Sequence, residues 1–293
     1  MSATISRGPQ TQAAAPAPKR PRRGFQWTEL GFWILALIIA ALFLLPLYVL
    51  LKVSVSTLAQ ATAPSPSYWI HNPTWANWDR LLKWSIIGSP LRHSLTVAFG
   101  TAIIAIVIAA PAAYVIARLP RDVRYLVVLG LLLTRMFPEV IIATPIAKNF
   151  FSWGLNDRDV GLILAHLIRS LPLAAWVLVG TFQVIPRELE EASHIDGGGR
   201  VGTLLRIVLP LAAPGIAVAG IFAWLDSWND LLYAIYLFLT ERTLPLLTYY
   251  YANRGTVTDV ATFSIILTIP VILLTMVLQH WIRTGYLSGA VKG

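Results

Sequence analysis

The sequence has no cysteine and few charged residues. Only 13% of its 293 residues are Asp, Glu, Lys or Arg, and 56% are hydrophobic, whereas roughly a quarter of the residues in a soluble domain are charged. The missing cysteine excludes disulfides, thiolate nucleophiles and cysteine-ligated metals. The low charge excludes a disordered chain and argues against an ordinary soluble enzyme. Much of the net charge of +9 lies in the first 23 residues and the rest between long apolar runs, which indicates a membrane protein rather than a nucleic-acid-binding one.

Six stretches are apolar over the about 20 residues that a helix needs to cross the roughly 30 Å hydrocarbon core. Three of them contain no charged residue, and each of the other three is interrupted by two ionisable residues. Because the apolar runs are continuous, we predict an all-α membrane protein with six transmembrane helices. The predicted spans are about 28–51, 93–117, 125–148, 159–184, 211–240 and 260–282.

An even number of spans puts both ends of the chain on one side of the membrane. With the ends inside, the inner segments hold thirteen Lys and Arg residues and the outer segments eight, so the positive-inside rule places both termini in the cytoplasm. Residues 1–24 are rich in Pro, Ala and Arg and lack apolar periodicity, which predicts a disordered cytoplasmic tail. Residues 25–293 then form the transmembrane domain.

The inner segment 185–210 has the pattern of two short helices. Pro186 suits a first helical turn, and three glutamates follow where the helix dipole favours anions. The glycines at 197–199 predict the end of this helix, because glycine adopts a left-handed cap without strain. A second helix over 200–209 is expected to end at Pro210. On physical grounds alone, the segment is either a docking site for another protein or a surface helix that only connects two spans.

The same segment carries a motif with five elements. Glu191-Ala192-Ser193, Gly197 and the stretch 207–210 (Ile-Val-Leu-Pro) stand at the spacing EAA-x3-G-x9-I-x-LP. This pattern resembles the EAA loop of ABC-importer permeases, with Ser193 as the only departure. The stretch 228–230 (Trp-Asn-Asp) and the ending 288–293 (Ser-Gly-Ala-Val-Lys-Gly) resemble the carbohydrate-uptake branch of that family, of the maltose-system type.

The resemblance implies an ABC-importer type I permease fold in which residues 185–210 hold a cytoplasmic coupling helix. That helix would sit in a cleft of an ATPase, and closure of the ATPase dimer on ATP would swing the spans between inward-facing and outward-facing states. The implied partners are a second, homologous permease, the ATPase dimer and an external or periplasmic sugar-binding protein, all at the bacterial cytoplasmic (inner) membrane. The residues implied in ATPase coupling are Glu190, Glu191, Ala192, Ser193, Asp196, Gly197, Ile207, Leu209 and Pro210. The terminal residues 290–293 are implied to reach the same ATPases.

The sequence carries no nucleotide-binding motif. A P-loop needs Gly-Lys-[Ser/Thr] to hold phosphate and magnesium, and none of the five lysines follows a glycine. The metal-binding His-Glu-x-x-His and nucleophile Gly-x-Ser-x-Gly patterns are absent as well. We therefore expect a subunit that is not an enzyme and binds no cofactor itself, with ATP and Mg bound by the partner ATPase.

Three pairs of ionisable residues lie inside the predicted spans, where each such residue costs about 2.5–3.5 kcal/mol on insertion scales. Two interpretations stay open. The charges are either buried pairs that lock the helices together, Arg135 with Glu139 and Arg169 with an aspartate, or they line a path that binds sugar hydroxyls. In the second case Trp224 and Trp228 would stack on the sugar. The residues of the predicted path are Arg135, Glu139, His166, Arg169, Trp224, Asp226, Trp228, Asn229 and Asp230.

Two other functions also stay open. The acidic residues and His166 would suit a proton-coupled secondary transporter, although the internal repeat typical of that class is not visible. An ABC-importer permease for a non-sugar solute is the other alternative. The sequence does not identify the sugar or the subunit that holds it, and Arg135 with Arg169 leaves an anionic substrate open.

Overall fold

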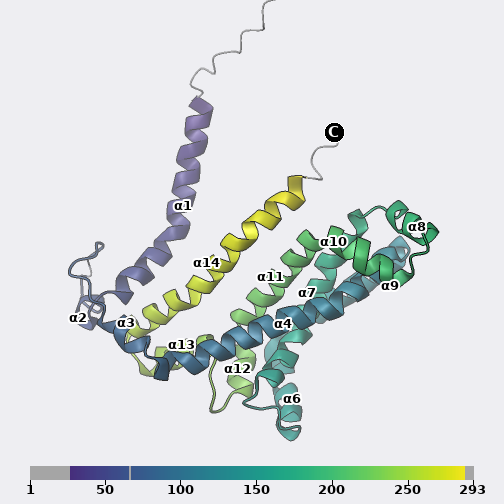
Figure 1. Ribbon diagram of the computed structural model, residues 1–293. Helices are drawn as coiled ribbons and strands as arrows, with labels where there is room; N and C mark the ends of the chain where they lie inside the picture. The colour runs from purple at the N-terminus through teal and green to yellow at the C-terminus, as the bar shows by residue number, and fades with distance from the viewer. Residues whose placement is uncertain (1–26, 66, 288–293) are drawn as a thin grey trace, which may run out of the picture. The chain divides into compact units, whose positions relative to one another are not determined.

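Helices and short turns make up the described part of the chain. The computed structural model describes residues 27–65 and 67–287, and these residues contain no strand, which confirms the all-α prediction (Figure 1). The predicted tail 1–24 and the terminal residues 290–293 lie outside the described residues.

The described residues divide into two units, one that ends at residue 46 and one that begins at residue 47. Helix α1 (Trp27–Ser54) begins in the first unit and ends in the second. At 1.5 Å per residue, its 28 residues are long enough to cross the roughly 30 Å hydrocarbon core. This helix corresponds to the first predicted span.

Long helices form the core of the second unit. They are α4 (Trp84–Arg118), α7 (Asp159–Val184), α11 (Ala213–Trp228) and α14 (Val257–Leu287). The buried face of α4 is lined by alanines spaced three or four residues apart, namely Ala98, Ala102, Ala105, Ala109, Ala113 and Ala117. Small side chains let membrane helices approach closely. Gly215 of α11 serves the same purpose, because a Cβ atom there would collide with Thr181 of α7.

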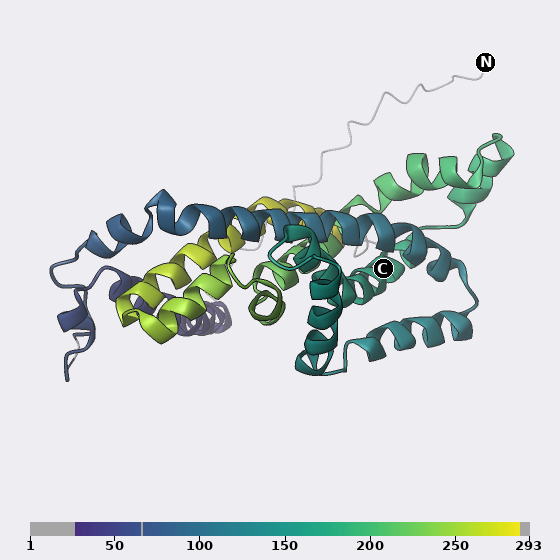
Figure 2. The same ribbon diagram turned by 90° about the horizontal axis from the view of Figure 1, so that it is seen from below.

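The predicted span 125–148 is not one straight helix. It is divided into α5 (Arg121–Thr134) and α6 (Glu139–Ser152), which are bent by 78°, and Figure 2 shows them meeting at a sharp corner. Pro138 directly precedes α6. Because the residue before a proline avoids the helical region, the helix is interrupted at this point.

The predicted span 211–240 is also interrupted. Helix α11 ends at Trp228, and a turn separates it from the short helix α12 (Leu232–Leu237). On its other side, residues 200–211 are bent by 79° from α11. Among the described residues, four single helices are long and apolar enough to cross a membrane. The number rises to six if each bent pair of helices counts as one span. That upper number agrees with the six predicted spans.

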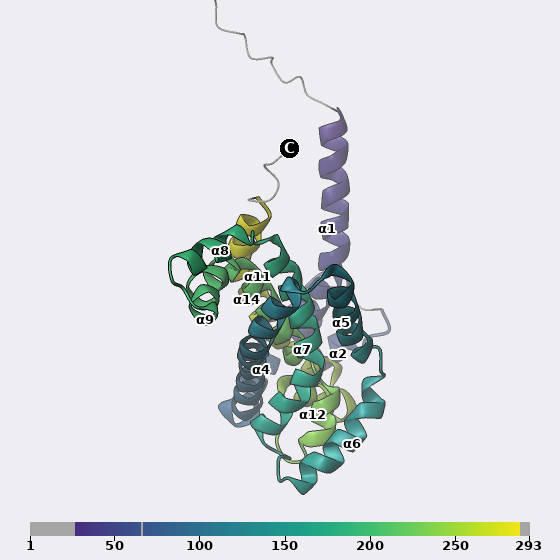
Figure 3. The same ribbon diagram turned by 90° about the vertical axis from the view of Figure 1, so that its right-hand side faces the viewer.

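Short helices lie at both ends of the second unit. At one end are α8 (Glu188–Ile195), α9 (Arg200–Thr203), the π-helical segment η1 (Leu204–Val208) and α10 (Leu209–Leu211). At the other end are α2 (Leu58–Ala61), α3 (Ala76–Leu81) and α13 (Leu244–Arg254). Figure 3 shows α8 and α9 grouped together at their end of the unit. The whole predicted coupling segment therefore lies at one end.

Candidate functional site

The predicted coupling segment folds as a short helix, a glycine turn and a second helical run. Helix α8 is followed by Gly197, whose φ of +84° is the left-handed conformation that commonly ends helices. The second run is present over the predicted residues 200–209, but it contains the π-helical turn η1. π-helical turns are rare in proteins, and those that do occur are frequently found at functional sites. The expectation of a regular second helix is therefore wrong in this detail.

The segment exposes apolar side chains. Ile195 is 87% exposed and Val201 69%, and these two residues lie on either side of the glycine turn. The predicted coupling residues that are exposed are Glu191, Ala192, Asp196, Gly197 and Pro210, whereas Ser193, Ile207 and Leu209 are half-buried. Sequence analysis missed Ile195 and Val201. Two apolar residues flanking a glycine turn are the signal that would have identified them.

Glu190 differs from the other glutamates of α8. Its carboxylate forms an ion pair with Arg118 at the end of α4 and accepts a hydrogen bond of 2.7 Å from the hydroxyl of Tyr114. The residue is buried. Glu190 therefore faces the interior of this chain rather than the exposed docking surface on which sequence analysis placed it.

His166 of α7 lies between two residues near the end of α11. Its Nδ1 atom is 2.7 Å from Ser227 Oγ, and its Nε2 atom is 3.1 Å from Asp230 Oδ2. The side chains of His166 and Asp230 are buried, with 4% and 6% exposed. Asp230 also accepts a hydrogen bond from the backbone N–H of Ala234 at 3.2 Å. These contacts tie α7, α11 and α12 together.

Arg169 of α7 bridges two carboxylates. It forms an ion pair with Glu139 of α6, and its Nε atom lies 2.9 Å from Asp226 Oδ1 of α11. Arg135 Nη2 lies 3.6 Å from the same oxygen. One of the two interpretations of the sequence pairs Arg135 with Glu139 and Arg169 with an aspartate. The second pair is present, with Asp226, whereas Glu139 pairs with Arg169 and not with Arg135. The bend between α5 and α6 explains the difference, because the two residues do not share one helix face.

A cavity of about 520 Å³ lies beside these charges. Five of the nine residues of the predicted path line it, namely Glu139, Arg169, Asp226, Asn229 and Asp230. Apolar side chains complete its wall, including Phe222 and Leu232. Apolar walls with a few polar groups are typical of ligand sites. The described residues contain no group of His, Asp and Glu arranged to hold a metal ion.

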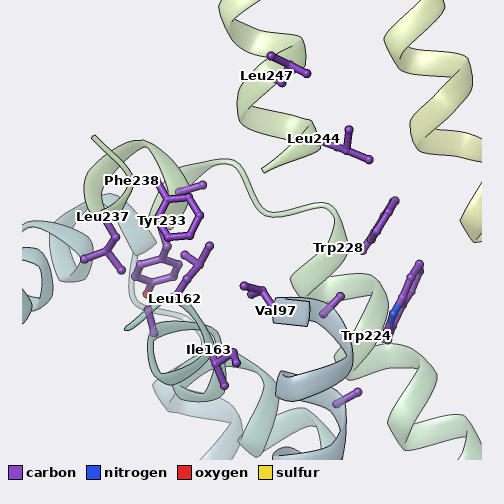
Figure 4. Close-up of a cluster of buried hydrophobic side chains, with 14 of the residues drawn as sticks. Val97, Leu162, Ile163, Trp224, Trp228, Tyr233, Leu237, Phe238, Leu244 and Leu247 are labelled. Carbon is purple, nitrogen blue, oxygen red and sulfur yellow. The ribbon is translucent and has the colours of Figure 1, made fainter. Parts of the chain in front are cut away.

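Trp224 and Trp228 do not line this cavity. Their rings stack on each other, with centroids 4.9 Å apart and planes 11° apart, as Figure 4 shows. The Nε1 atom of Trp228 donates a hydrogen bond to the carbonyl of Leu267 at 3.2 Å. Both side chains are buried in the hydrophobic core. Their placement in this structure does not support the prediction that they stack on a sugar.

A polar cluster that sequence analysis missed lies at the opposite end from α8. Asp157 has a φ of +52° and accepts hydrogen bonds from the backbone N–H groups of residues 239–241. Burial raises the pKa of the Asp157 carboxyl, but these hydrogen bonds outweigh burial and hold the pKa below its ordinary value. Nearby, His93 lies 2.5 Å from Asp159 and 3.1 Å from Glu241.

Comparison with known proteins identifies relatives along most of the chain. Residues 102–288 match the family described as binding-protein-dependent transport system inner membrane component. A putative ABC transporter permease protein of Streptomyces antibioticus is 36% identical over 75% of this chain and 98% of that protein. The trehalose transport system permease protein SugB of Mycobacterium tuberculosis is 34% identical over 75% of this chain and 82% of its own length.

Solved structures show the same fold. A bacterial ABC transporter involved in the import of the acidic polysaccharide alginate has a chain that superposes with a TM-score of 0.70. The two chains are 20% identical, and the match covers 88% of this chain and 99% of the other. The family match, the relatives and the helical fold with its EAA-like loop agree with one another. The chain belongs to the inner membrane components of binding-protein-dependent transport systems, which are multi-pass permease subunits and not enzymes.

Proposed function

We propose that this chain is the permease subunit of an ATP-driven carbohydrate importer, with both termini in the cytoplasm. Three relatives support the substrate class, since their names give trehalose, trehalose and maltose, and alpha-glucoside as the transported compounds. A second permease, an ATPase dimer and an external sugar-binding protein complete the proposed complex. The ATPase supplies the nucleotide chemistry, and this chain supplies one half of the membrane path.

The exposed apolar surface around the glycine turn is the observation that carries the coupling role. Ile195 and Val201 lie on either side of Gly197, at the end of the unit where α8 and α9 are grouped. Burying them against a partner is favourable, because transfer of apolar surface out of water contributes about 25 cal/mol per Å². Glu191 and Asp196, exposed on the same segment, offer carboxylates to a basic partner. In the proposed mechanism, closure of the ATPase dimer displaces this segment and the spans follow.

The coupling role is tested with the double variant Ile195→Glu/Val201→Glu. We expect the permease to reach the membrane but to lose the ATPase during purification, because the two apolar side chains that the partner would bury are then replaced by charged ones. The matched control Ile195→Val keeps the apolar surface and should retain the ATPase. Full retention of the ATPase and of sugar uptake by the double variant would contradict the proposal.

The cavity beside Arg169 is the proposed contribution of this chain to the sugar path. Its support is the set of polar side chains at its wall. Replacement of Asn229, which lines the cavity, by alanine should raise the KM of uptake about three- to tenfold, the worth of one hydrogen bond. Trp228→Phe changes a buried residue that does not line the cavity and should leave KM unchanged. Equal KM values for both variants and the wild type would remove this cavity from the path.

The energy source is tested separately. Membership in a binding-protein-dependent family is at odds with the proton-coupled alternative. Uptake into vesicles that contain ATP should therefore persist when an ionophore collapses the proton gradient. Loss of uptake under these conditions would favour proton coupling and reject the ATP-driven importer.

A further inference from the structure

Glu190 is held by two side chains of α4. Its Oε1 atom pairs with the guanidinium of Arg118, and its Oε2 atom accepts the 2.7 Å hydrogen bond from Tyr114. Tyr114 and Arg118 are four residues apart, so both project from the same face of α4. The Tyr114 ring also packs edge-on against Phe182 of α7, with centroids 5.9 Å apart. Both carboxylate oxygens of Glu190 are thus occupied by α4.

Two hydrogen bonds from side chains to backbone carbonyls also join the end of α4 to the residues that lead into α8. Arg118 Nη2 donates to the carbonyl of Ile185 at 3.3 Å, and Arg187 Nη2 donates to the carbonyl of Arg118 at 3.0 Å. The residues on either side of the turn into α8 are therefore both bonded to the last residue of α4. On the α8 side, the Nδ1 atom of His194 lies 2.5 Å from the carbonyl oxygen of Glu190.

The covalent connections of α8 do not fix its direction. At its start, Ile185 and Pro186 form a short extended link from α7, since Ile185 has a ψ of 121°. At its end, the glycine turn at 197–199 leads into α9. An eight-residue helix is too short to be stable alone. Among the described residues, one side-chain hydrogen bond joins α8 to the following run, between Ser193 Oγ and Thr203 Oγ1 at 2.9 Å.

We propose that Tyr114, Arg118 and Glu190 form a clamp that positions the coupling helix on α4, so that a displacement of α8 moves α4 together with α7. The inference rests on the proposed function, because it assigns a mechanical role to the segment that the ATPase would contact. The three side chains are positioning residues, since none of them lies on the exposed surface or lines the cavity beside Arg169. Without the clamp, α8 would follow the ATPase while α4 stays behind.

The clamp is tested in the complete importer, reconstituted in proteoliposomes with its ATPase, partner permease and sugar-binding protein. The readout is the amount of sugar imported for each ATP hydrolysed. Glu190→Gln removes the charge at nearly constant size and should lower this ratio about fivefold or more, the lower end of coupling between distant sites. Basal ATP hydrolysis, measured for each assembled complex, should stay at its wild-type value. The matched control Glu188→Gln removes an exposed charge from the same helix and should leave the ratio unchanged.

A second variant separates coupling from folding. A single substitution leaves a buried charge without its partner, which is strongly destabilising, whereas apolar replacement of both partners is often neutral. The double variant Arg118→Met/Glu190→Leu should therefore fold and assemble, yet import as little sugar per ATP as Glu190→Gln. Tyr114→Phe should give a smaller decrease, because it removes one hydrogen bond and keeps the ion pair.

The outcomes distinguish the clamp from the proposed function. If the double variant assembles and imports sugar at the wild-type ratio, the clamp has no role in coupling, and the importer assignment is unaffected. If the wild-type complex imports sugar without hydrolysing ATP, the proposed function itself fails. A lowered ratio in Glu190→Gln and in the double variant, with a normal ratio in Glu188→Gln, supports the clamp.

Discussion

The indole rings of Trp224 and Trp228 lie nearly parallel, one helical turn apart, with their centroids 4.9 Å from each other. Trp228 is 1% exposed and also bonds to the carbonyl of Leu267, so it joins α11 to α14. We predict that Trp228→Ala lowers the free energy of unfolding by about 3–5 kcal/mol, the usual cost of removing a large buried aromatic side chain. Denaturant unfolding in detergent micelles, followed by circular dichroism, measures this loss.

The control for this prediction is Trp69→Ala. Trp69 is 74% exposed, so its truncation should change the free energy of unfolding by less than about 0.5 kcal/mol. A Trp228→Ala protein as stable as the wild type, but with a raised KM for sugar, would restore the sugar-stacking role that its burial argues against.

Asp230 has a structural role that does not depend on any solute. Removal of its carboxylate leaves the N–H of Ala234 without its acceptor and removes the oxygen that lies 3.1 Å from Nε2 of His166. Asp230→Ala should therefore lower the free energy of unfolding by about 1–3 kcal/mol, the cost of a buried donor left unsatisfied. Asp230→Asn keeps an oxygen for Ala234 and should cost less. Equal stability of the alanine and asparagine variants would show that the hydrogen bond from Ala234 does not contribute.

Asp157 should make stability depend on pH at the acidic end. Because its folded pKa lies below the ordinary value of 3.8, the ionised carboxylate stabilises the fold above about pH 4, and this contribution is lost as the pH falls through the folded pKa. Asp157→Asn tolerates the same left-handed backbone but cannot titrate. The wild type should be the more stable of the two at about pH 7, and the difference should shrink at about pH 3. A difference that stays constant over this range would contradict the prediction.

Gly197 and Gly199 offer a matched pair of substitutions in the coupling segment. A Cβ atom added at either position would have no other group within 4 Å. Of these two glycines, only Gly197 has a positive φ. Gly197→Ala should therefore cost about 1–2 kcal/mol of backbone strain, whereas Gly199→Ala should be nearly neutral. Thermal unfolding and copurification of the ATPase measure both effects. Equal behaviour of the two variants would show that the left-handed turn is not required.

Apolar runs and one motif were sufficient to predict the helical fold and the two short helical runs within residues 185–210. Span length and motif spacing are local properties, so they can be read from a linear sequence. The direction of a single side chain is not local. Glu190 and Glu191 are adjacent and chemically identical, and only the position of Arg118, 72 residues away along the chain, decides which of them turns inward.

The bend at Pro138 had a local signal. Pro138 interrupts an otherwise apolar run, yet the length of that run predicts one span over about 125–148. The 78° angle instead separates Arg135 from Glu139, and this separation changes which charges meet. Burial of Trp224 and Trp228 could not be predicted either, because an aromatic pair on one face of a helix is equally suited to a core and to a binding site.

Arg135 and Arg169 already pair with carboxylates, and this pairing limits which solutes the cavity can bind. Glu139, Asp226 and Asp230 face it together with Arg169, while Arg135 lies against Asp226 from outside that lining. A phosphorylated or sulfonated sugar would therefore have to compete with the carboxylates that already form ion pairs with the guanidinium groups. An uncharged polyol can instead exchange hydrogen bonds with the same wall without separating any opposite charges, which gives neutral solutes an electrostatic advantage at this face.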